Sequence, residues 1–321
     1  MKKLLTLFAS ALMLTSQMSF AQTAESEKAV YNETTGVGYD DLKTAWNAVS
    51  GTATLIMNTD QTIDVRLNSG TNKITLKGAN RNVRLTRTNK NNLLFLAQGN
   101  NDNSGEIHIE NITLDGKGDS TDKCFTEASG SGKNYGIMTM TNVIIDNAIS
   151  THNQGLVTVK VNGFLTLNNV IFTNTCKVND NFGYVFVGNE HLTISGNNEM
   201  TIAIQANGKN CVNVNGTLEN TNPIVIYPYD AESFPENYAV VKGCSDPSKF
   251  NIQGNSNMTL KAENGNLVAA VDSETGVTDI ISDNADAPVE YYNLQGVKVA
   301  NPENGIFIRV QGKDVKKVVI K

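Results

Sequence analysis

The feature of this sequence that most constrains its fold is a nine-residue pattern that occurs three times without gaps. Each copy reads apolar, any residue, apolar, polar, Asn, apolar, any residue, apolar, polar. The copies span residues 107–115, 138–146 and 165–173, and a looser fourth copy begins at Leu192. The Asn residues of the three copies are 31 and 27 positions apart, which predicts one structural unit per repeat of that length.

The spacing inside each copy predicts a bend. The first apolar pair lies on one face of a short strand, and the second pair is out of phase with it by one residue, so a straight strand would send that pair to solvent. A corner at the Asn, a residue that tolerates the left-handed backbone conformation, would turn both pairs into one core. We therefore predict that Asn111, Asn142 and Asn169 stack at successive corners as an amide ladder.

A third short apolar segment precedes each two-strand unit. It recurs at residues 93–96, 124–126, 157–161, 184–187 and 211–214. Three short strands in each repeat of roughly 27 residues or more are typical of a parallel β-helix, in which each coil adds about 4.8 Å of rise. We predict an all-β, single-stranded, right-handed parallel β-helix with about seven coils.

The remaining segments complete the domain organisation. Residues 40–49 read as a capped amphipathic helix that covers the first coil. We divide the chain into residues 1–21 as signal peptide, 22–38 as a linker, 39–270 as the β-helix with its helical cap, 271–288 as a second linker, and 289–321 as a small C-terminal β domain.

The first residues have the composition of a secretory signal. Lys2 and Lys3 precede an apolar run over residues 4–14, and small residues at Ser19 and Ala21 place cleavage after Ala21. The alternative is a buried N-terminal helix. Since no later stretch is apolar enough to span a bilayer, we expect an extracellular or outer-surface protein that reaches its destination through the periplasm.

Composition excludes one class of partner. Without Lys2 and Lys3 the chain has 24 basic and 32 acidic residues, a net charge of −8, which disfavours nucleic acid. The 43 Asn residues suit a fold with many tight corners. Cys124 and Cys211 are expected on similar positions three coils apart, too far for a disulfide; Cys176 could reach Cys211, but we expect all four cysteines to be unpaired.

The N-terminal helix, the strand at residues 74–79 and the Asn-cornered repeats together resemble the pectate-lyase-like β-helix superfamily. The tail, with Tyr291-Tyr292-Asn293-Leu294-Gln295-Gly296 and Lys316-Lys317-Val318-Val319-Ile320-Lys321, resembles the C-terminal sorting domain of the type IX secretion system. That resemblance implies export across the outer membrane with the secretion machinery as a partner. A plain β-hairpin cap is the alternative for the tail.

The first resemblance also implies where chemistry would lie. In β-helix lyases a groove on one outer strand face holds calcium-binding carboxylates and a Lys or Arg base. The corresponding outward positions here are expected to carry one cation and no carboxylate, so we predict no catalytic residues and no cofactor. These positions are Phe95, Thr126, Thr158, Lys160, Tyr184, Phe186, Asn213 and Asn215. No His has a partner at metal-ligand spacing, so no metal site is expected either.

Two groups of residues are candidates for a site. The acidic loop contains Asp115, Lys117, Asp119 and Asp122, which could ligate calcium or place a Lys over a uronic acid; the alternative is a solvated Gly-Ser-Asp loop. The second group could form a glycan-binding platform of aromatic faces and polar side chains, unless a loop covers the rings. It consists of Lys160, Tyr184, Phe186, Asn213 and Asn215.

Three functional hypotheses follow. The preferred one is a secreted or cell-surface, non-catalytic β-helix that binds extracellular polysaccharide or another surface. The second is a polysaccharide lyase or glycoside hydrolase that acts on uronic-acid-containing glycans through the acidic loop. The third is a structural adhesin whose length is its function.

Overall fold

The computed structural model describes residues 25–99, 103–179, 183–189, 191–229, 231–254, 257–271, 288–312 and 314–321. The predicted signal peptide, with its cleavage after Ala21, lies outside the described residues. The predicted linker 271–288 also lies outside them, apart from its first and last residues. The chain divides into two compact units, residues 1–271 and 272–321, which are described separately.

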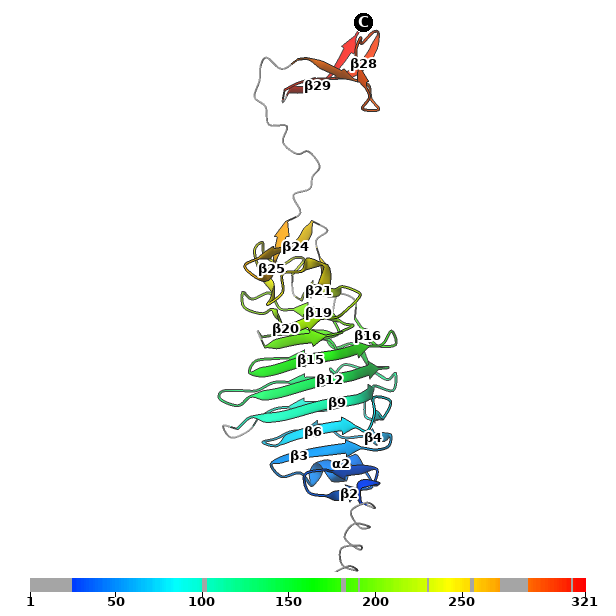
Figure 1. Ribbon diagram of the computed structural model, residues 1–321, viewed down its shortest axis with the longest axis vertical. Helices are drawn as coiled ribbons and strands as arrows, with labels where there is room; N and C mark the ends of the chain where they lie inside the picture. Colours follow the sequence, from blue (N-terminus) through cyan, green and yellow to red (C-terminus); the bar gives the residue numbers. More distant parts are fainter. Residues whose placement is uncertain are drawn as a thin grey trace, which may run out of the picture. The chain divides into compact units, whose positions relative to one another are not determined.

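The first unit is a parallel β-solenoid of about 7 turns, as the sequence predicts (Figure 1). One sheet stacks in parallel the strands β3 (Thr52–Met57), β6 (Lys73–Gly78), β9 (Gly105–Asp115), β12 (Gly136–Asp146), β15 (Gly163–Phe172), β18 (Leu192–Gly196), β20 (Val212–Leu218) and β22 (Ala239–Lys242). A second parallel sheet stacks β5 (Leu67–Asn68), β8 (Phe95–Ala97), β11 (Thr126–Ala128), β14 (Val157–Val159), β17 (Val185–Val187), β19 (Thr201–Ile204), β21 (Ile224–Pro228) and β23 (Phe250–Ile252).

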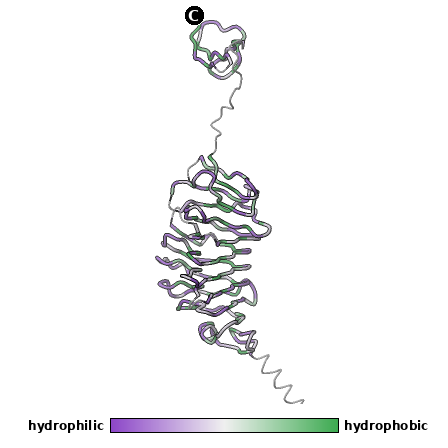
Figure 2. The backbone as a smooth tube through the Cα atoms, turned by 90° about the vertical axis from the view of Figure 1, so that its left-hand side faces the viewer, coloured by the Kyte–Doolittle hydropathy of each residue, from purple (hydrophilic) through white to green (hydrophobic). Residues whose placement is uncertain are grey.

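Short strands complete the coils. In the first half β4 (Gln61–Ile63) pairs with β7 (Arg84–Arg87), which in turn pairs with the second part of β9. Further along, β10 (Ser120–Thr121), β13 (Ile149–Ser150) and β16 (Lys177–Val178) form a three-stranded parallel sheet. Apolar segments recur on successive coils, as the green stretches of Figure 2 show.

The Asn corner is confirmed. β9, β12 and β15 each run through both apolar pairs as one long strand, and the pairing between neighbouring strands is interrupted only at the Asn. The backbone φ angles of Asn111, Asn142 and Asn169 are 52°, 55° and 55°, in the left-handed region. Both apolar pairs consequently face inward, and Ile109 before the corner and Ile112 after it are each 0% exposed.

The corner side chains also bond along the stack. Asn142 Nδ2 donates a hydrogen bond of 2.7 Å to Asn111 Oδ1, and Asn111 Nδ2 donates one of 3.2 Å to the carbonyl of Gly78 on the preceding coil. On the following coil Asn169 Oδ1 accepts a hydrogen bond of 2.7 Å from the backbone N–H of Asn197. The amides thus satisfy backbone groups that the bend removes from the β-ladder.

A short helix covers the N-terminal end of the solenoid. It is α2 (Leu42–Asn47), which lies within the predicted range of residues 40–49. Its N-cap Asp41 accepts a hydrogen bond from the Thr44 N–H, and it buries Leu42, Ala45 and Trp46. The predicted linker 22–38 is wrong in its second half. β1 (Val30–Asn32) and β2 (Val37–Tyr39) form antiparallel pairs that extend the first sheet beyond β3, because the end of the stack needs hydrogen-bond partners.

The C-terminal end of the solenoid is closed by antiparallel strands. β25 (Asn266–Val271) pairs antiparallel with β22 and with β24 (Met258–Glu263). The second unit is an antiparallel sheet in the order β27 (Lys298–Val299), β26 (Glu290–Tyr292), β28 (Gly305–Gln311) and β29 (Asp314–Ile320). This sheet agrees with the small C-terminal β domain that the sequence predicts.

One predicted strand belongs to the wrong sheet. Residues 211–214 were expected to continue the segment that includes Val185, but Val212 pairs with Leu192 in the first sheet. In the second sheet Val185 instead pairs with Ile202. The reason is a change of coil length, since Leu165 to Leu192 spans 27 residues and Leu192 to Val212 only 20. A constant repeat therefore misplaces this segment.

The corner generates a stability prediction. Replacing Asn142 by Ala removes the ladder hydrogen bond and places a less tolerant residue at positive φ, so we expect a loss of about 2 kcal/mol. Asn142→Gly removes the same hydrogen bond but keeps the backbone freedom, and should lose about half as much. Urea unfolding followed by circular dichroism measures both, and equal losses would contradict the role assigned to the left-handed corner.

Candidate functional site

Some residues of the second sheet that were predicted to face outward face the core instead. The row that contains Phe95, Thr126 and Val157 faces the core, and Phe95 and Thr126 are each 0% exposed rather than outward. The neighbouring row, which contains Glu127 and Phe186, faces outward. The outer face of this sheet therefore carries a carboxylate, that of Glu127. The prediction of no carboxylate on this face is wrong.

The predicted aromatic platform does not form. The Phe186 side chain is only 2% exposed and lies edge-to-face against Tyr229, with ring centroids 4.7 Å apart. The ring of Tyr184 instead stacks on Phe172, with centroids 5.1 Å apart, and its hydroxyl donates to the Cys176 carbonyl. The alternative that these rings are covered is thus the correct one for Phe186.

The two Asn residues of the predicted platform lie on the other sheet. Asn213 pairs with Thr193 in β20 of the first sheet, and its Nδ2 donates a hydrogen bond of 3.0 Å to the Leu192 carbonyl. Asn215 is exposed on the same strand. The structure therefore does not bring Asn213 or Asn215 together with Phe186, because the shortened coil assigns them to different sheets.

Lys160 is committed to an ion pair. Its Nζ lies 2.9 Å from Glu127 Oε2, and the Cys124 thiol donates to the same oxygen at 3.9 Å. Burial, together with the neighbouring Glu127 carboxylate, raises the pKa of the Cys124 thiol to about 11, so it is not a thiolate nucleophile near neutral pH. Burial and the Lys160 ammonium also lower the pKa of His152. The Lys160–Glu127 ion pair therefore lies on the outer face of the second sheet, with Cys124 and His152 beside it.

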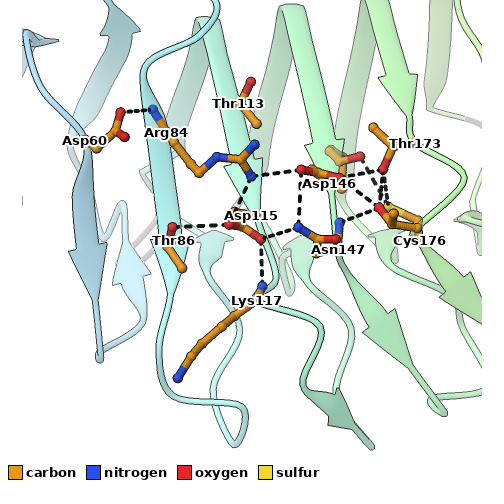
Figure 3. Close-up of polar contacts among 12 residues, drawn as sticks. Asp60, Arg84, Thr86, Thr113, Asp115, Lys117, Asp146, Asn147, Thr173 and Cys176 are labelled. Atoms are coloured by element: carbon orange, nitrogen blue, oxygen red, sulfur yellow. Dashed lines mark hydrogen bonds and ion pairs between the residues drawn. The ribbon is translucent and has the colours of Figure 1, made fainter.

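Within the predicted acidic loop, Asp115 is tied into the solenoid. One of its oxygens accepts hydrogen bonds from the Lys117 N–H at 2.8 Å and from Asn147 Nδ2 at 3.2 Å. The other lies 3.0 Å from Arg84 Nη1 and accepts from Thr86 Oγ1 at 3.4 Å (Figure 3). Asp115 is 9% exposed, so its carboxylate has little capacity left for calcium.

The other residues of the acidic loop do not converge on Asp115. The Lys117 amine points away from this carboxylate (Figure 3) and lies 4.0 Å from Asp119. Asp122 pairs with its sequence neighbour Lys123 at 3.6 Å. Over the described residues, no group of three or more His, Cys, Asp or Glu side chains is arranged to hold a metal ion.

Arg84, which pairs with Asp115, was not predicted from the sequence as a member of this region. Its guanidinium also lies 2.9 Å from Asp146, one coil beyond Asp115. Asp146 Oδ1 accepts hydrogen bonds of 2.8 Å from the hydroxyls of Thr173 and Thr175. Burial alone would raise the pKa of Asp146, but the hydrogen bonds from Arg84 and the two threonines outweigh it and lower the pKa below its ordinary value. The network links neighbouring coils and is structural.

A different surface offers ligand-binding groups: the outer face of the first sheet on β12, β15 and β18. Alternate residues of these strands face outward in register and form three columns, which we call the outer array. The first column, called the apolar column for Ile137 and Phe164, also contains His191, which directly precedes β18. The middle column contains Thr139, Thr166 and Thr193, and the third column contains Thr141, Asn168 and Ser195. All nine residues are partly exposed.

The polar side chains of the outer array differ from those at the Asn corners in their hydrogen bonding. Within the part of the chain that the structure describes, none of its hydroxyls is hydrogen-bonded to another residue, and neither is the Asn168 amide. This distinguishes the array from the Asn corners and from the Arg84 network, whose polar groups are bonded to other residues. The hydroxyls and the amide are therefore available to a ligand.

The apolar column leads into a hollow. Phe164 and His191 stack with centroids 4.1 Å apart and an interplanar angle of 20°, and the exposed Tyr135 lies edge-on to Phe164 at 5.6 Å. Beside His191 is a hollow of about 290 Å³. It is lined by Val161, Asn162, Gly188, Asn189, His191, Asn207, Lys209 and Asn210. The shortened coil that follows β18 ends beside this space.

Sequence alternation contained the signal for the outer array. The residues between Met138 and Met140, and between Leu165 and Leu167, are threonines in every regular copy after the first. The copy that begins at Ile107 has His108 in that position, so the threonine does not recur in all three copies. The stacked Phe164 and His191 precede the repeated pattern and were therefore not assigned to it.

The remaining observations add no further site. None of the four cysteines forms a disulfide. Among the described residues, no helix has the length and apolar character needed to cross a membrane. Comparison with family models, with curated proteins and with solved structures found no match to this chain. A functional conclusion therefore depends on the geometry of the chain's own residues.

The Arg84 network generates a prediction about pH. A carboxyl with a lowered folded-state pKa contributes stability that is complete above its ordinary pKa and is lost as pH falls through the folded value. Arg84→Gln should therefore cost about 2 kcal/mol at pH 7, and the cost should shrink below about pH 4 as Asp146 becomes protonated.

Thermal and urea unfolding at pH 7 and pH 3 measure this difference. Arg66→Gln is the matched control, because Arg66 is exposed and has no ion pair in the described chain. A loss of the same size at both pH values would show that Arg84 acts through packing of its side chain and not through its charge.

Proposed function

We propose that this protein is an exported, non-catalytic β-solenoid that binds an extracellular polysaccharide through the outer array. The observation that carries the proposal is the column of unpaired hydroxyls at Thr139, Thr166 and Thr193, beside an apolar column and a hollow. Hydroxyls on successive coils offer repeated donors and acceptors to a polymer of sugar units, and apolar rings suit sugar C–H groups.

The non-catalytic part of the proposal rests on the fate of the candidate acid–base residues. Asp115 is bonded to Arg84 and Lys160 is bonded to Glu127, so the groups that a lyase would use are engaged in structural ion pairs. Export is supported by the charged and apolar N-terminal residues. The proposal retains membership of the pectate-lyase-like superfamily and a sorting role for the C-terminal unit.

Binding should depend on the hydroxyls of the middle column. Thr166→Val replaces a hydroxyl by a methyl group of similar shape, so the strand keeps its β-branched side chain while the donor is lost. We expect about a tenfold weaker affinity, the equivalent of one good hydrogen bond. The measurement is binding of the mature chain to an array of immobilised plant and microbial polysaccharides, followed by titration calorimetry on the polymers it binds.

The matched control is Thr62→Val, a threonine exposed on β4 and outside the outer array. It should bind as the unmodified chain does, and both variants should unfold at the same urea concentration. Equal affinities for the unmodified chain and Thr166→Val would remove the outer array from the binding site.

The sorting role of the second unit has its own test. Removing residues 288–321 takes away a separate compact unit and leaves the solenoid and its closing strand β25 intact. In a host with a type IX system we expect the truncated chain to fold and to accumulate in the periplasm. Its appearance at the cell surface in unchanged amount would assign the tail another role.

A further inference from the structure

The outer face of the first sheet changes its charge along the stack. On β6 and β9 it carries an ion pair, in which Lys73 Nζ lies 2.7 Å from Glu106, and His108 Nε2 lies 3.3 Å from the same carboxylate. On β12, β15 and β18 the outer array contains no carboxylate and no ammonium group. The unpaired hydroxyls thus lie on the uncharged part of the face.

We infer that the outer array selects uncharged polysaccharide over polymers of uronic acids. This inference rests on the proposed function and specifies its ligand class. A neutral sugar hydroxyl exchanges a bond to water for a bond to Thr166 or Thr193 at little net cost. A carboxylate brought to the same place loses hydration that only a charged or multiply donating site would restore, and neutral hydroxyls give weaker bonds than ammonium or guanidinium groups.

The net charge of the chain acts in the same direction. With 32 acidic residues and 24 basic residues outside the predicted signal peptide, the field of the protein repels a polyanion at long range. The exception at the site is Lys209, an exposed residue that lines the hollow and has no ion pair within the described chain. A single surface ammonium on the rim is the group through which an acidic sugar would be accepted.

The test uses pairs of polymers that share a backbone and differ in charge. Methyl-esterified and de-esterified galacturonan form one pair, dextran and carboxymethyl dextran a second, and hydroxyethyl and carboxymethyl cellulose a third. Binding to the mature full chain is measured by calorimetry in 0.15 M salt, where long-range repulsion is largely screened beyond about 8 Å. We expect at least tenfold tighter binding of the neutral member in any pair that binds.

Variants locate the selectivity. Thr166→Lys places an ammonium group in the middle column and should narrow or reverse the preference, whereas Thr62→Lys, on β4 and outside the outer array, should leave the preference unchanged. Equal or tighter binding of the charged member by the unmodified chain would overturn the inference. The clearest case would be one in which Lys209→Gln abolished the binding of the charged member. Binding to no member of any pair would instead overturn the proposed function, and the inference with it.

Discussion

The structure depends on one backbone event, the left-handed turn at an Asn between two apolar pairs of opposite phase. Without the turn, Ile112 and its equivalents would face solvent; with it, both pairs enter one core. Because the turn recurs at the same register on β9, β12 and β15, every residue of these strands lies above its counterpart on the next coil. The hydrogen bond from Asn142 to Asn111 couples neighbouring corners, so an error at one coil would be felt by the next. A slip of one residue would turn the whole outer array into the core.

Much of the solenoid could be predicted because its signal is local and repeated. Out-of-phase apolar pairs specify a bend in the backbone, and Asn is one of the few residues that accept it without strain. The prediction was wrong where the repeat length changes. Val212 lies in a Val-Asn-Val segment that resembles the third strand of earlier coils, and only the shorter coil before it assigns Val212 to the first sheet. Strand alternation identifies a strand but not which of two stacked sheets it joins.

The candidate sites were harder to predict, for two different physical reasons. On the second sheet the outward row is itself largely buried, as Phe186 shows, so hydrophobicity does not separate the inner face from the outer face. Arg84 presents the second reason: its side chain reaches across two coils to Asp146, a contact between residues 62 positions apart that no local pattern encodes. The threonine columns were visible in the sequence, but their availability to a ligand follows only from the absence of partners in the described structure.

Regular stacking inside the solenoid has a consequence outside it. Since the core fixes equivalent residues at a spacing of about 4.8 Å, a side chain that binds weakly on one coil is repeated on the next without a further change of fold. A single neutral hydroxyl contributes little to affinity because it must first release water. Three hydroxyls in a column, held rigidly by Met138, Leu165 and Leu192 beneath the sheet, can bind one chain together, and each contact after the first is intramolecular. Affinity for a polymer can thus arise from groups that would not retain a single sugar, which is the physical basis of the proposal that the outer array binds a polysaccharide.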